Sequence, residues 1–267
     1  MAILLSLSQS DVYLLIFLFV TFMLLSSTLT YAFLQKGGEE GFLSRQVHKP
    51  TFTRVSHPQF GRVYVIDQKD MISRTIMHNN EWEPELNAIM ASHYKPGTDI
   101  LDIGANMGFS SLGINSRVPI TGTVHAFEPQ YRLCTLLSYN LHRLPKSKIY
   151  NCAVSDKTSL ISYVVNDDNV GATPVIRREA SHDVYVPTIR LDDHIDLFKT
   201  KISLVKIDVE GHELQVLKGS KRLIQKYLPT LEIDIYGSID GVVEFLKPMG
   251  YELIWNKNAD YFFENKK

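Results

Sequence analysis

A glycine-bearing turn with an acidic side chain at its start follows a short apolar run near residue 100. The segment DIGANMG, residues 102–108, has the pattern D-x-G-x-x-x-G. Gly104 can adopt backbone angles closed to other residues, and Gly108 allows the next helix to approach the strand. The backbone of such a turn can approach a flat ligand, and we expect the Asp102 carboxylate at the mouth of that pocket. The alternative role for Asp102 is to cap the following helix.

A second acidic residue, Glu128, ends the next apolar run, VHAFEP at residues 124–129. At the end of a second parallel strand, an acidic side chain can accept hydrogen bonds from both hydroxyls of a ribose. The dinucleotide fingerprint G-x-G-x-x-G would need glycine at two positions that here are Asn106 and Phe109. The pattern therefore favours a nucleoside that carries an amino acid and a positive centre, as S-adenosylmethionine does. NAD is the alternative cofactor.

Three more titratable residues, Asp208, Glu210 and His212, follow the apolar run 204–207. Transfer of a methyl group from a sulfonium to a hydroxyl requires alignment of the two and removal of the hydroxyl proton. A positioned base contributes about 10² to 10⁴ in rate, and all three residues are candidates. His212 has the most suitable ordinary pKa, and Asp208 is equally suited to hold the methionine amino group. Simpler roles are open too, since a histidine at a helix start is often an exposed cap and Glu210 and Glu213 can stabilise the helix dipole.

Acidic residues also end two neighbouring strands of the predicted sheet. Carboxylates are the ligands that hard divalent cations prefer, so a metal site that organises a hydroxyl substrate is a further alternative. Acidic residues at strand ends are common for other reasons, and we predict no metal. The residues concerned are Asp208, Glu210, Glu232 and Asp234.

The elements that must position these residues alternate between strands and helices. Apolar runs typical of buried strands fall at 100–103, 123–127, 148–152, 204–207 and 230–235, and a final hairpin is predicted at 251–255 and 261–263. Helical spacing falls between them, at 109–116, at 212–226, at 242–246 and in a helix whose apolar face runs from Leu133 to Leu141, after a first helix that opens at 81 with Asn79 or Asn80 as its cap. The pattern predicts a mostly parallel sheet covered on both faces, with an antiparallel edge strand from the hairpin. Ligands bind such sheets at the carboxyl ends of the strands, where the strand order reverses.

A polar, strand-rich insertion from 158 to 189 interrupts this alternation. Its charged residues suit a lid over a sugar, although a solvated surface loop is the simpler interpretation. Those charged residues are Asp167, Asp168, Arg177 and Arg178.

The first part of the chain predicts a membrane anchor. No charged residue occurs from 12 to 34, which is long enough for one transmembrane helix. We expect a tail at 1–11, the span at 12–34, a linker at 35–60 and the catalytic domain at 61–267. A cleaved signal peptide and a buried core helix are the alternatives to the span. The basic residues that follow it favour a cytosolic catalytic domain, with a Golgi-type lumenal orientation as the alternative; they are Lys36, Arg45, Lys49 and Arg54.

Charge and cysteine content exclude some classes of function. The chain has 28 Lys and Arg against 29 Asp and Glu, and this balance argues against nucleic acid as the main partner. The two cysteines, Cys134 and Cys152, form neither a disulfide framework nor a zinc signature.

Several segments together resemble the FkbM family of class I methyltransferases. They are DIGANMGFSSL, VHAFEP, NCAVSD, TIRLDD and LVKIDVEGHELQVLKG, in the family's order, within residues 81–250. The resemblance implies a Rossmann-like seven-stranded sheet with an antiparallel last strand, and S-adenosylmethionine as methyl donor. It implies O-methylation of a sugar or small-molecule hydroxyl, and we expect the acceptor to be a hydroxyl of a sugar or glycoconjugate. An NAD-dependent oxidoreductase and a non-catalytic membrane-tethered binding module are the alternative functions.

The resemblance also implies roles for individual residues. Asp208 and Glu210 would face the methyl group and the acceptor, with His212 beside them. Residues 169–173 depart from the turn that many members carry, which leaves the substrate contacts of that loop open. The predicted cofactor-binding residues are Asp102, Gly104, Ala105, Asn106, Gly108, Phe127, Glu128, Cys152, Ala153 and Asp208.

Overall fold

The computed structural model describes residues 52–66, 69–79, 81–163 and 184–266. All of them belong to one compact unit, residues 50–267, which is described here by itself. Within these ranges no helix has both the length and the apolar character needed to cross a bilayer. The predicted tail at 1–11 and span at 12–34 lie outside the described residues, so both stay predictions.

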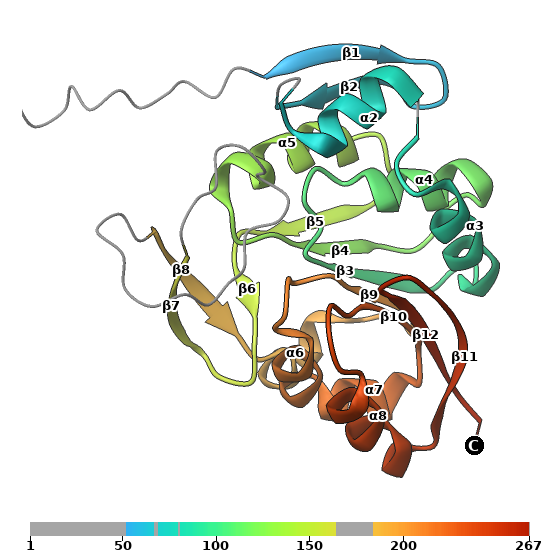
Figure 1. The fold of residues 1–267 in the computed structure, drawn as a ribbon, viewed down its shortest axis with the longest axis vertical. Helices are drawn as coiled ribbons and strands as arrows, with labels where there is room; N and C mark the ends of the chain where they lie inside the picture. Colours follow the sequence, from blue (N-terminus) through green and yellow to red (C-terminus); the bar gives the residue numbers. More distant parts are fainter. Residues whose placement is uncertain (1–51, 67–68, 80, 164–183, 267) are drawn as a thin grey trace, which may run out of the picture. The chain divides into compact units, whose positions relative to one another are not determined.

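A seven-stranded mixed sheet forms the centre of this unit (Figure 1). Its order is β11-β12-β10-β9-β3-β4-β5. The five strands from β10 to β5 run parallel to their neighbours, whereas β12 runs antiparallel to both β10 and β11. This confirms the Rossmann-like sheet with an antiparallel last strand. The strands are β3 (Asp99–Ile103), β4 (Val124–Phe127), β5 (Ser147–Tyr150), β9 (Ile202–Ile207), β10 (Thr230–Asp234), β11 (Tyr251–Lys257) and β12 (Asp260–Asn265).

The final hairpin supplies the edge strand, as predicted. β11 forms the edge and pairs antiparallel with β12, which lies between β10 and β11. The side chains of Phe262 and Phe263 explain why β12 is the inner strand of the hairpin. They are fully buried in two different apolar clusters, and a strand that buries both of its faces needs a position inside the sheet.

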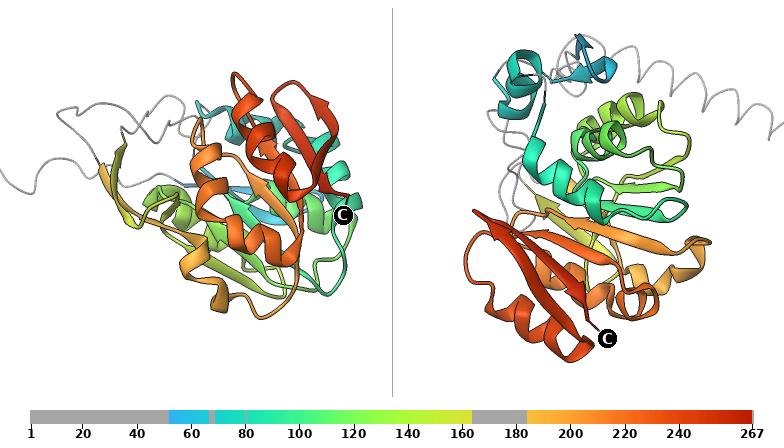
Figure 2. Two further views of the ribbon diagram at one scale, coloured as in Figure 1. Left: turned by 90° about the horizontal axis from the view of Figure 1, so that it is seen from below. Right: turned by 90° about the vertical axis from the view of Figure 1, so that its right-hand side faces the viewer.

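Helices cover both faces of the sheet (Figures 1 and 2). On one side lie α3 (Pro84–His93), α4 (Phe109–Arg117) and α5 (Tyr131–Leu141); on the other lie α6 (Glu213–Gly219), α7 (Lys221–Tyr227) and α8 (Asp240–Leu246). Each face has its own apolar core, because successive strand residues point to opposite faces. Ile100 and Leu204 belong to one core, and their neighbours Leu101 and Val205 belong to the other.

A hairpin and a helix precede the first strand of the large sheet. They are β1 (Thr53–His57), β2 (Gly61–Val65) and α2 (Met71–Asn79). The predicted linker at 35–60 therefore extends too far, since residues 53–57 form a strand. The buried side chain of Asn140 in α5 holds this hairpin in place. Its Oδ1 accepts from the Tyr64 backbone N–H at 2.8 Å, and its Nδ2 donates to the Tyr64 carbonyl at 2.9 Å.

Two helix boundaries differ from those predicted. The helix expected at 212–226 is broken at Ser220 into α6 and α7, and a Cβ atom on Gly219 would lie 1.9 Å from the carbonyl oxygen of Ser155. The helix expected to open at 81 begins at Pro84. Its N-cap is Glu83 rather than Asn79 or Asn80.

The strand-rich insertion contributes β7 and β8 to a small separate sheet with the order β6-β8-β7. Its strands are β6 (Ala153–Val154), β7 (Ser159–Tyr163) and β8 (Val184–Ile189), and short 3₁₀ turns follow at Leu191–Asp193, Ile195–Leu197 and Lys247–Met249. The charged residues proposed for a lid and the turn at 169–173 lie outside the described residues.

Candidate active site

The loops that follow β3 and β9 meet where the strand order reverses. From β3 the chain continues to β4 on one side, and from β9 it continues to β10 on the other. Gly104, directly after β3, has φ +84°, and a Cβ atom there would lie 1.7 Å from the carbonyl oxygen of Asp208. The Asp208 N–H donates to the Ile103 carbonyl at 2.9 Å. Only glycine permits this contact, which forms the floor of the crevice expected in such sheets.

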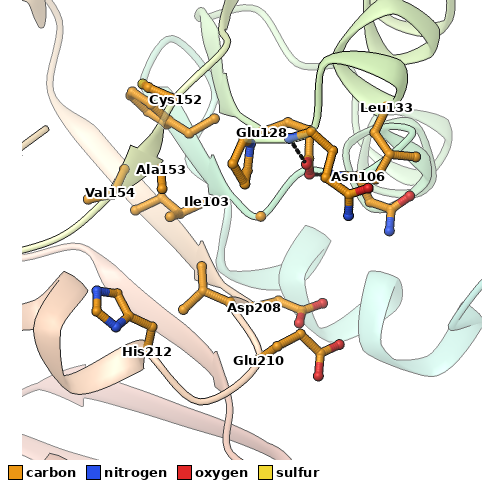
Figure 3. Close-up of a pocket in the computed structure, with 15 residues that line it drawn as sticks. Ile103, Asn106, Glu128, Leu133, Cys152, Ala153, Val154, Asp208, Glu210 and His212 are labelled. Carbon is orange, nitrogen blue, oxygen red and sulfur yellow. Dashed lines mark hydrogen bonds between the residues drawn. The ribbon is translucent and has the colours of Figure 1, made fainter. Parts of the chain in front are cut away.

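Two adjoining pockets open from this crevice, and they share Gly104, Asn106, Asp208 and Glu210. The Glu128 pocket (Figure 3) encloses about 50 Å³ and is also lined by Ile103, Phe127, Glu128, Pro129, Gln130, Leu133, Cys152, Ala153, Val154, Val209 and His212. The Asp234 pocket encloses about 340 Å³ and is also lined by Met71, Ile72, Trp82, Glu83, Ala105, Met107, Phe109, Ser110, Lys206, Asp234 and Tyr236.

Glu128 lies where the sequence predicts it, at the end of β4 and in the wall of its pocket. Its Oε2 accepts from the Asn106 backbone N–H at 2.9 Å, and its Oε1 accepts from the Gln130 backbone N–H at 2.8 Å. Burial raises the pKa of this carboxyl to about 7, although the two hydrogen bonds oppose the shift. Each carboxylate oxygen has two lone pairs, so Glu128 can still accept from ligand hydroxyls.

Asp102 does not lie at the mouth of a pocket, which corrects the prediction for its side chain. It lines neither pocket, and its Oδ2 accepts from the Ser111 hydroxyl at 2.6 Å in the first turn of α4. Burial raises the pKa of Asp102, against the opposing effects of Lys206 and Ser111. The carboxylate therefore faces inward between sheet and helix and contacts α4 through the Ser111 hydroxyl, without capping a backbone N–H of that helix.

Asp102 belongs to a row of charged residues across the middle of the sheet. Lys206 pairs in register with Asp102 on β3 and with Glu232 on β10. Its Nζ lies 2.8 Å from Oδ2 of Asp208. Burial disfavours the charged ammonium, but the carboxylates of Asp208 and Glu232 hold the pKa of Lys206 well above its usual range. The buried ammonium of Lys206 thus attracts several carboxylates at once.

The three candidates for a general base do not converge on one point. Asp208 is paired with Lys206, whereas Glu210 is half-buried and lines both pockets. Burial raises the pKa of Glu210 to about 7, with further contributions from Asp208 and Glu213. A base of that pKa is well matched to proton transfer near neutral pH.

The His212 side chain is directed away from these carboxylates, although all three residues line the Glu128 pocket. It lines only the Glu128 pocket and is 5% exposed. Its Nε2 lies 2.9 Å from the Ser155 hydroxyl, and burial lowers its pKa. Figure 3 shows the imidazole and the carboxylates of Asp208 and Glu210 pointing in opposite directions. The geometry favours Glu210 as the base.

The remaining predicted cofactor residues divide between the pockets and the core. Phe127, Cys152 and Ala153 line the Glu128 pocket, and Ala105 lines the Asp234 pocket. Gly108 lines neither. It has φ +88°, and a Cβ atom there would lie 2.8 Å from Leu137 in α5. Gly108 thus permits close packing of the turn on α5.

Sequence reasoning missed the part of the Asp234 pocket that comes from outside the strand ends. The sequence predicts no role in the site for the pocket residues Trp82, Glu83, Lys206 and Tyr236. No pattern in the sequence indicates that the residues just before α3 lie close to the end of β10 in the fold. A side chain on a turn between two helices is placed there by tertiary packing alone.

The four carboxylates proposed as a divalent-cation site do not form one. In the described part of the chain, no three His, Cys, Asp or Glu side chains come together in a metal-binding arrangement. Glu232 is fully buried beneath the pocket, in register with Lys206.

Comparison with known proteins identifies the domain that carries this site. The family model described as the methyltransferase FkbM domain matches residues 102–253. The chain belongs to the FkbM methyltransferase family. The FkbM segment contains every residue that lines the Glu128 pocket, whereas Met71, Ile72, Trp82 and Glu83 of the Asp234 pocket precede it.

Two curated relatives are similar to part of the chain. The hexuronic acid methyltransferase AglP of Haloferax volcanii is 29% identical over 145 residues, which cover 53% of this chain and 58% of that protein. The 2-O-methyltransferase NoeI of Sinorhizobium fredii is 27% identical over 149 residues, which cover 49% of this chain and 61% of that protein. The chain therefore spans less than two thirds of the length of either relative.

The crystal structure of an FkbM methyltransferase from Methylobacillus flagellatus is also similar. It is 15% identical, with a TM-score of 0.45, and the match covers 74% of this chain and 62% of that one. A likeness at this level carries no argument about function.

Proposed function

We propose that this FkbM-family protein is an S-adenosylmethionine-dependent O-methyltransferase that acts on a hydroxyl of a sugar or glycoconjugate. The observation that carries the proposal is the Glu128 carboxylate at the end of β4, in a crevice shared with Asp208 and Glu210. Family membership supports it, as do the two relatives, one described as a hexuronic acid methyltransferase and the other as a 2-O-methyltransferase. The relatives differ in their printed activities, so they do not decide which acceptor this chain uses.

The residues present fit S-adenosylmethionine in charge and polarity. Glu128 offers acceptors for the ribose hydroxyls, and Ile103, Leu133 and Val154 give the same pocket apolar walls. Asp208, at the junction of the two pockets, offers negative charge to the amino group and the sulfonium.

The bound cofactor would supply a methyl group already activated on a sulfonium. The chain must then position the acceptor hydroxyl and remove its proton. We assign proton removal to Glu210, because it lines both pockets and has a pKa of about 7. Asp208 is held by Lys206 at 2.8 Å and is better suited to bind a cationic group than to accept a proton.

Two parts of the proposal concern the whole chain. We propose that residues 12–34 anchor the protein in a membrane as a single span, with the catalytic unit in the cytosol. The support is the uncharged length of that segment and the basic residues that follow it.

An NAD-dependent oxidoreductase is the less favoured function, because Asn106 and Phe109 replace two glycines of the dinucleotide loop.

The experiment is a transfer assay with full-length protein and S-adenosylmethionine labelled in its methyl group, against a panel of glycosides and glycolipids. We expect label in a product that is stable to mild base, as a methyl ether is and a methyl ester is not. Substitution Glu252→Gln, on the exposed surface of β11, serves as the control variant and should leave transfer unchanged. Label only in base-labile esters, or only in amines, would contradict O-methylation of a hydroxyl.

A further inference from the structure

We propose that Glu83 and Asp234 select the acceptor: their carboxylates bind hydroxyls of a neutral saccharide and exclude saccharides that carry a negative charge. This inference rests on the proposed function, because it takes the Asp234 pocket as the acceptor site. The pocket is the larger of the two and adjoins the Glu128 pocket at Asp208 and Glu210. A ligand in it would therefore lie beside the proposed base.

The placement of Glu83 is built into the packing of two helices. Glu83 is the N-cap of α3 and has φ +49° and ψ +56°, a left-handed conformation that is uncommon for a residue with a side chain. The fully buried Asn87 holds this turn: its backbone N–H donates to the Glu83 carbonyl at 3.0 Å, and its Nδ2 donates to the Trp82 carbonyl at 2.6 Å. Such strained conformations cluster at functional sites.

Gly113 in α4 makes room for this arrangement. A Cβ atom at Gly113 would lie 2.2 Å from Nδ2 of Asn87. The two helices thus fix the turn that brings Trp82 and Glu83 to the pocket wall.

Asp234 reaches the same pocket from the opposite part of the chain, at the end of β10. It lies directly opposite Asp260 in the antiparallel pair with β12, and like charges at opposed positions are unfavourable. Its Oδ1 is buried and has no hydrogen-bond partner among the described residues. An acceptor hydroxyl that donated to Asp234 would satisfy a polar atom that the protein alone leaves unsatisfied.

The charge of the pocket decides which saccharides fit. Its described lining has four carboxylates, those of Glu83, Asp208, Glu210 and Asp234, and a single ammonium, that of Lys206. That ammonium is buried and already paired with Asp208. The cofactor would add one net positive charge, so an excess of negative charge remains. A neutral sugar offers hydroxyl donors to these carboxylates, whereas a uronic acid would bring a further carboxylate against them.

The carboxyl pKa values show that these groups disfavour further negative charge, and that both are mostly ionised only above about pH 7, where the binding test below is made. Burial is the main cause that raises the pKa of Glu83 and of Asp234 to about 7, and Asp208 and Asp260 raise both further. Trp82 and Tyr236 provide flat aromatic surface in the same lining, and Tyr236 is 70% exposed. Aromatic surface beside hydrogen-bond acceptors suits a sugar ring, whose faces are apolar and whose edge donates.

The test is equilibrium binding of matched sugars to the full-length protein in the presence of saturating S-adenosylhomocysteine. Each pair is a methyl hexoside and its hexosiduronic acid, which differ only at C6, in the gluco, galacto and manno series. We expect at least one neutral hexoside to bind about tenfold or more tightly than its uronate. Substitutions Glu83→Gln and Asp234→Asn keep shape and remove charge, and each should reduce that ratio at least about threefold. Glu85→Gln, on the exposed start of α3, should leave the ratio unchanged.

The outcomes separate this inference from the proposed function. Uronates that bind as tightly as neutral sugars, a ratio that neither variant changes, or no binding by any sugar would overturn the inference. Failure of S-adenosylhomocysteine to bind would overturn the cofactor part of the proposed function. If S-adenosylhomocysteine does not bind but neutral hexosides still bind more tightly than their uronates, the selection of neutral sugars by Glu83 and Asp234 would still be supported.

Discussion

Gly104 and Asp208 approach each other so closely that no side chain fits between them: a Cβ atom at Gly104 would lie 1.7 Å from the Asp208 carbonyl oxygen. Gly97 provides a matched comparison, because it has φ +82°, against +84° at Gly104, with nothing within 4 Å of its Cβ position. Alanine at either site must adopt a left-handed conformation, at a cost of roughly 1–2 kcal/mol. Gly104→Ala adds a backbone clash.

We therefore expect Gly104→Ala to lower the melting temperature of the protein much more than Gly97→Ala, and to abolish cofactor binding if the variant folds. Gly97→Ala should retain cofactor binding. Thermal unfolding of the two variants beside the wild type measures the difference. Equal melting temperatures would show that the β3 and β9 loops do not meet as described.

Removal of the Glu210 carboxylate separates the three candidates for the base. Glu210→Gln should reduce kcat for methyl transfer by about 10² to 10⁴, with little effect on cofactor affinity. His212→Asn should instead affect cofactor affinity or stability, because His212 lies only in the Glu128 pocket and contacts Ser155.

The pH dependence of kcat identifies the group directly. In the wild type the rate should rise with an apparent pKa near 7, the value to which burial raises Glu210. The rise should persist in His212→Asn and vanish in Glu210→Gln. A rise that vanishes in His212→Asn and persists in Glu210→Gln would assign the base to the histidine.

Ionisation of Asp234 should weaken the fold at alkaline pH. Burial raises its pKa from 3.8 to about 7 in the folded protein, so between these values the folded state holds a proton that the unfolded state has lost. The stability that this proton contributes is full below the unfolded pKa and is lost as pH rises through about 7. Asp234→Asn should therefore raise the melting temperature at pH 8 and change it little at pH 3.5.

The expected gain at pH 8 is modest because Asp234 is partly exposed, and solvent screens its interactions. An increase of about 1 to 3 °C corresponds to less than about 1 kcal/mol for a domain of this size. Asp196→Asn, at an exposed position, is the control and should show no gain at pH 8. A loss of stability in Asp234→Asn at pH 8 would mean that the ionised carboxylate has a favourable partner in the fold.

The elements could be predicted from the sequence because their signals are local. The alternation of apolar strands and helical spacing predicts the order of the elements from β3 to β12, and the strand-end positions of Glu128 and Asp208 follow from it. Strand β1 was taken for linker because residues 35–60 contain several glycine and proline residues typical of loops. The hairpin that β1 forms with β2 packs through Asn140, 76 residues away from Tyr64, and no local pattern shows that contact.

The direction of a side chain was harder to predict than its position along the chain. Asp102 was placed correctly in the β3 turn, but whether it faces a ligand or α4 depends on Ser111, which reaches back to it. His212 has the right residue type for a base, yet the loop of Glu210 and Gly211, with φ +54° and +97°, directs it away from the carboxylates. Such turns are set by tertiary contacts that residue type and spacing do not specify.

Binding of S-adenosylmethionine to the full-length protein, measured by isothermal titration calorimetry, tests the central claim most directly. We expect one site per chain, a loss of affinity of at least about tenfold in Glu128→Ala, and no change in Glu252→Ala, whose side chain is exposed on β11. Circular dichroism would confirm that both variants remain folded. Saturable binding to the wild type that Glu128→Ala weakens supports the account. Absence of binding to the folded wild type, or equal affinity in folded Glu128→Ala, would contradict it.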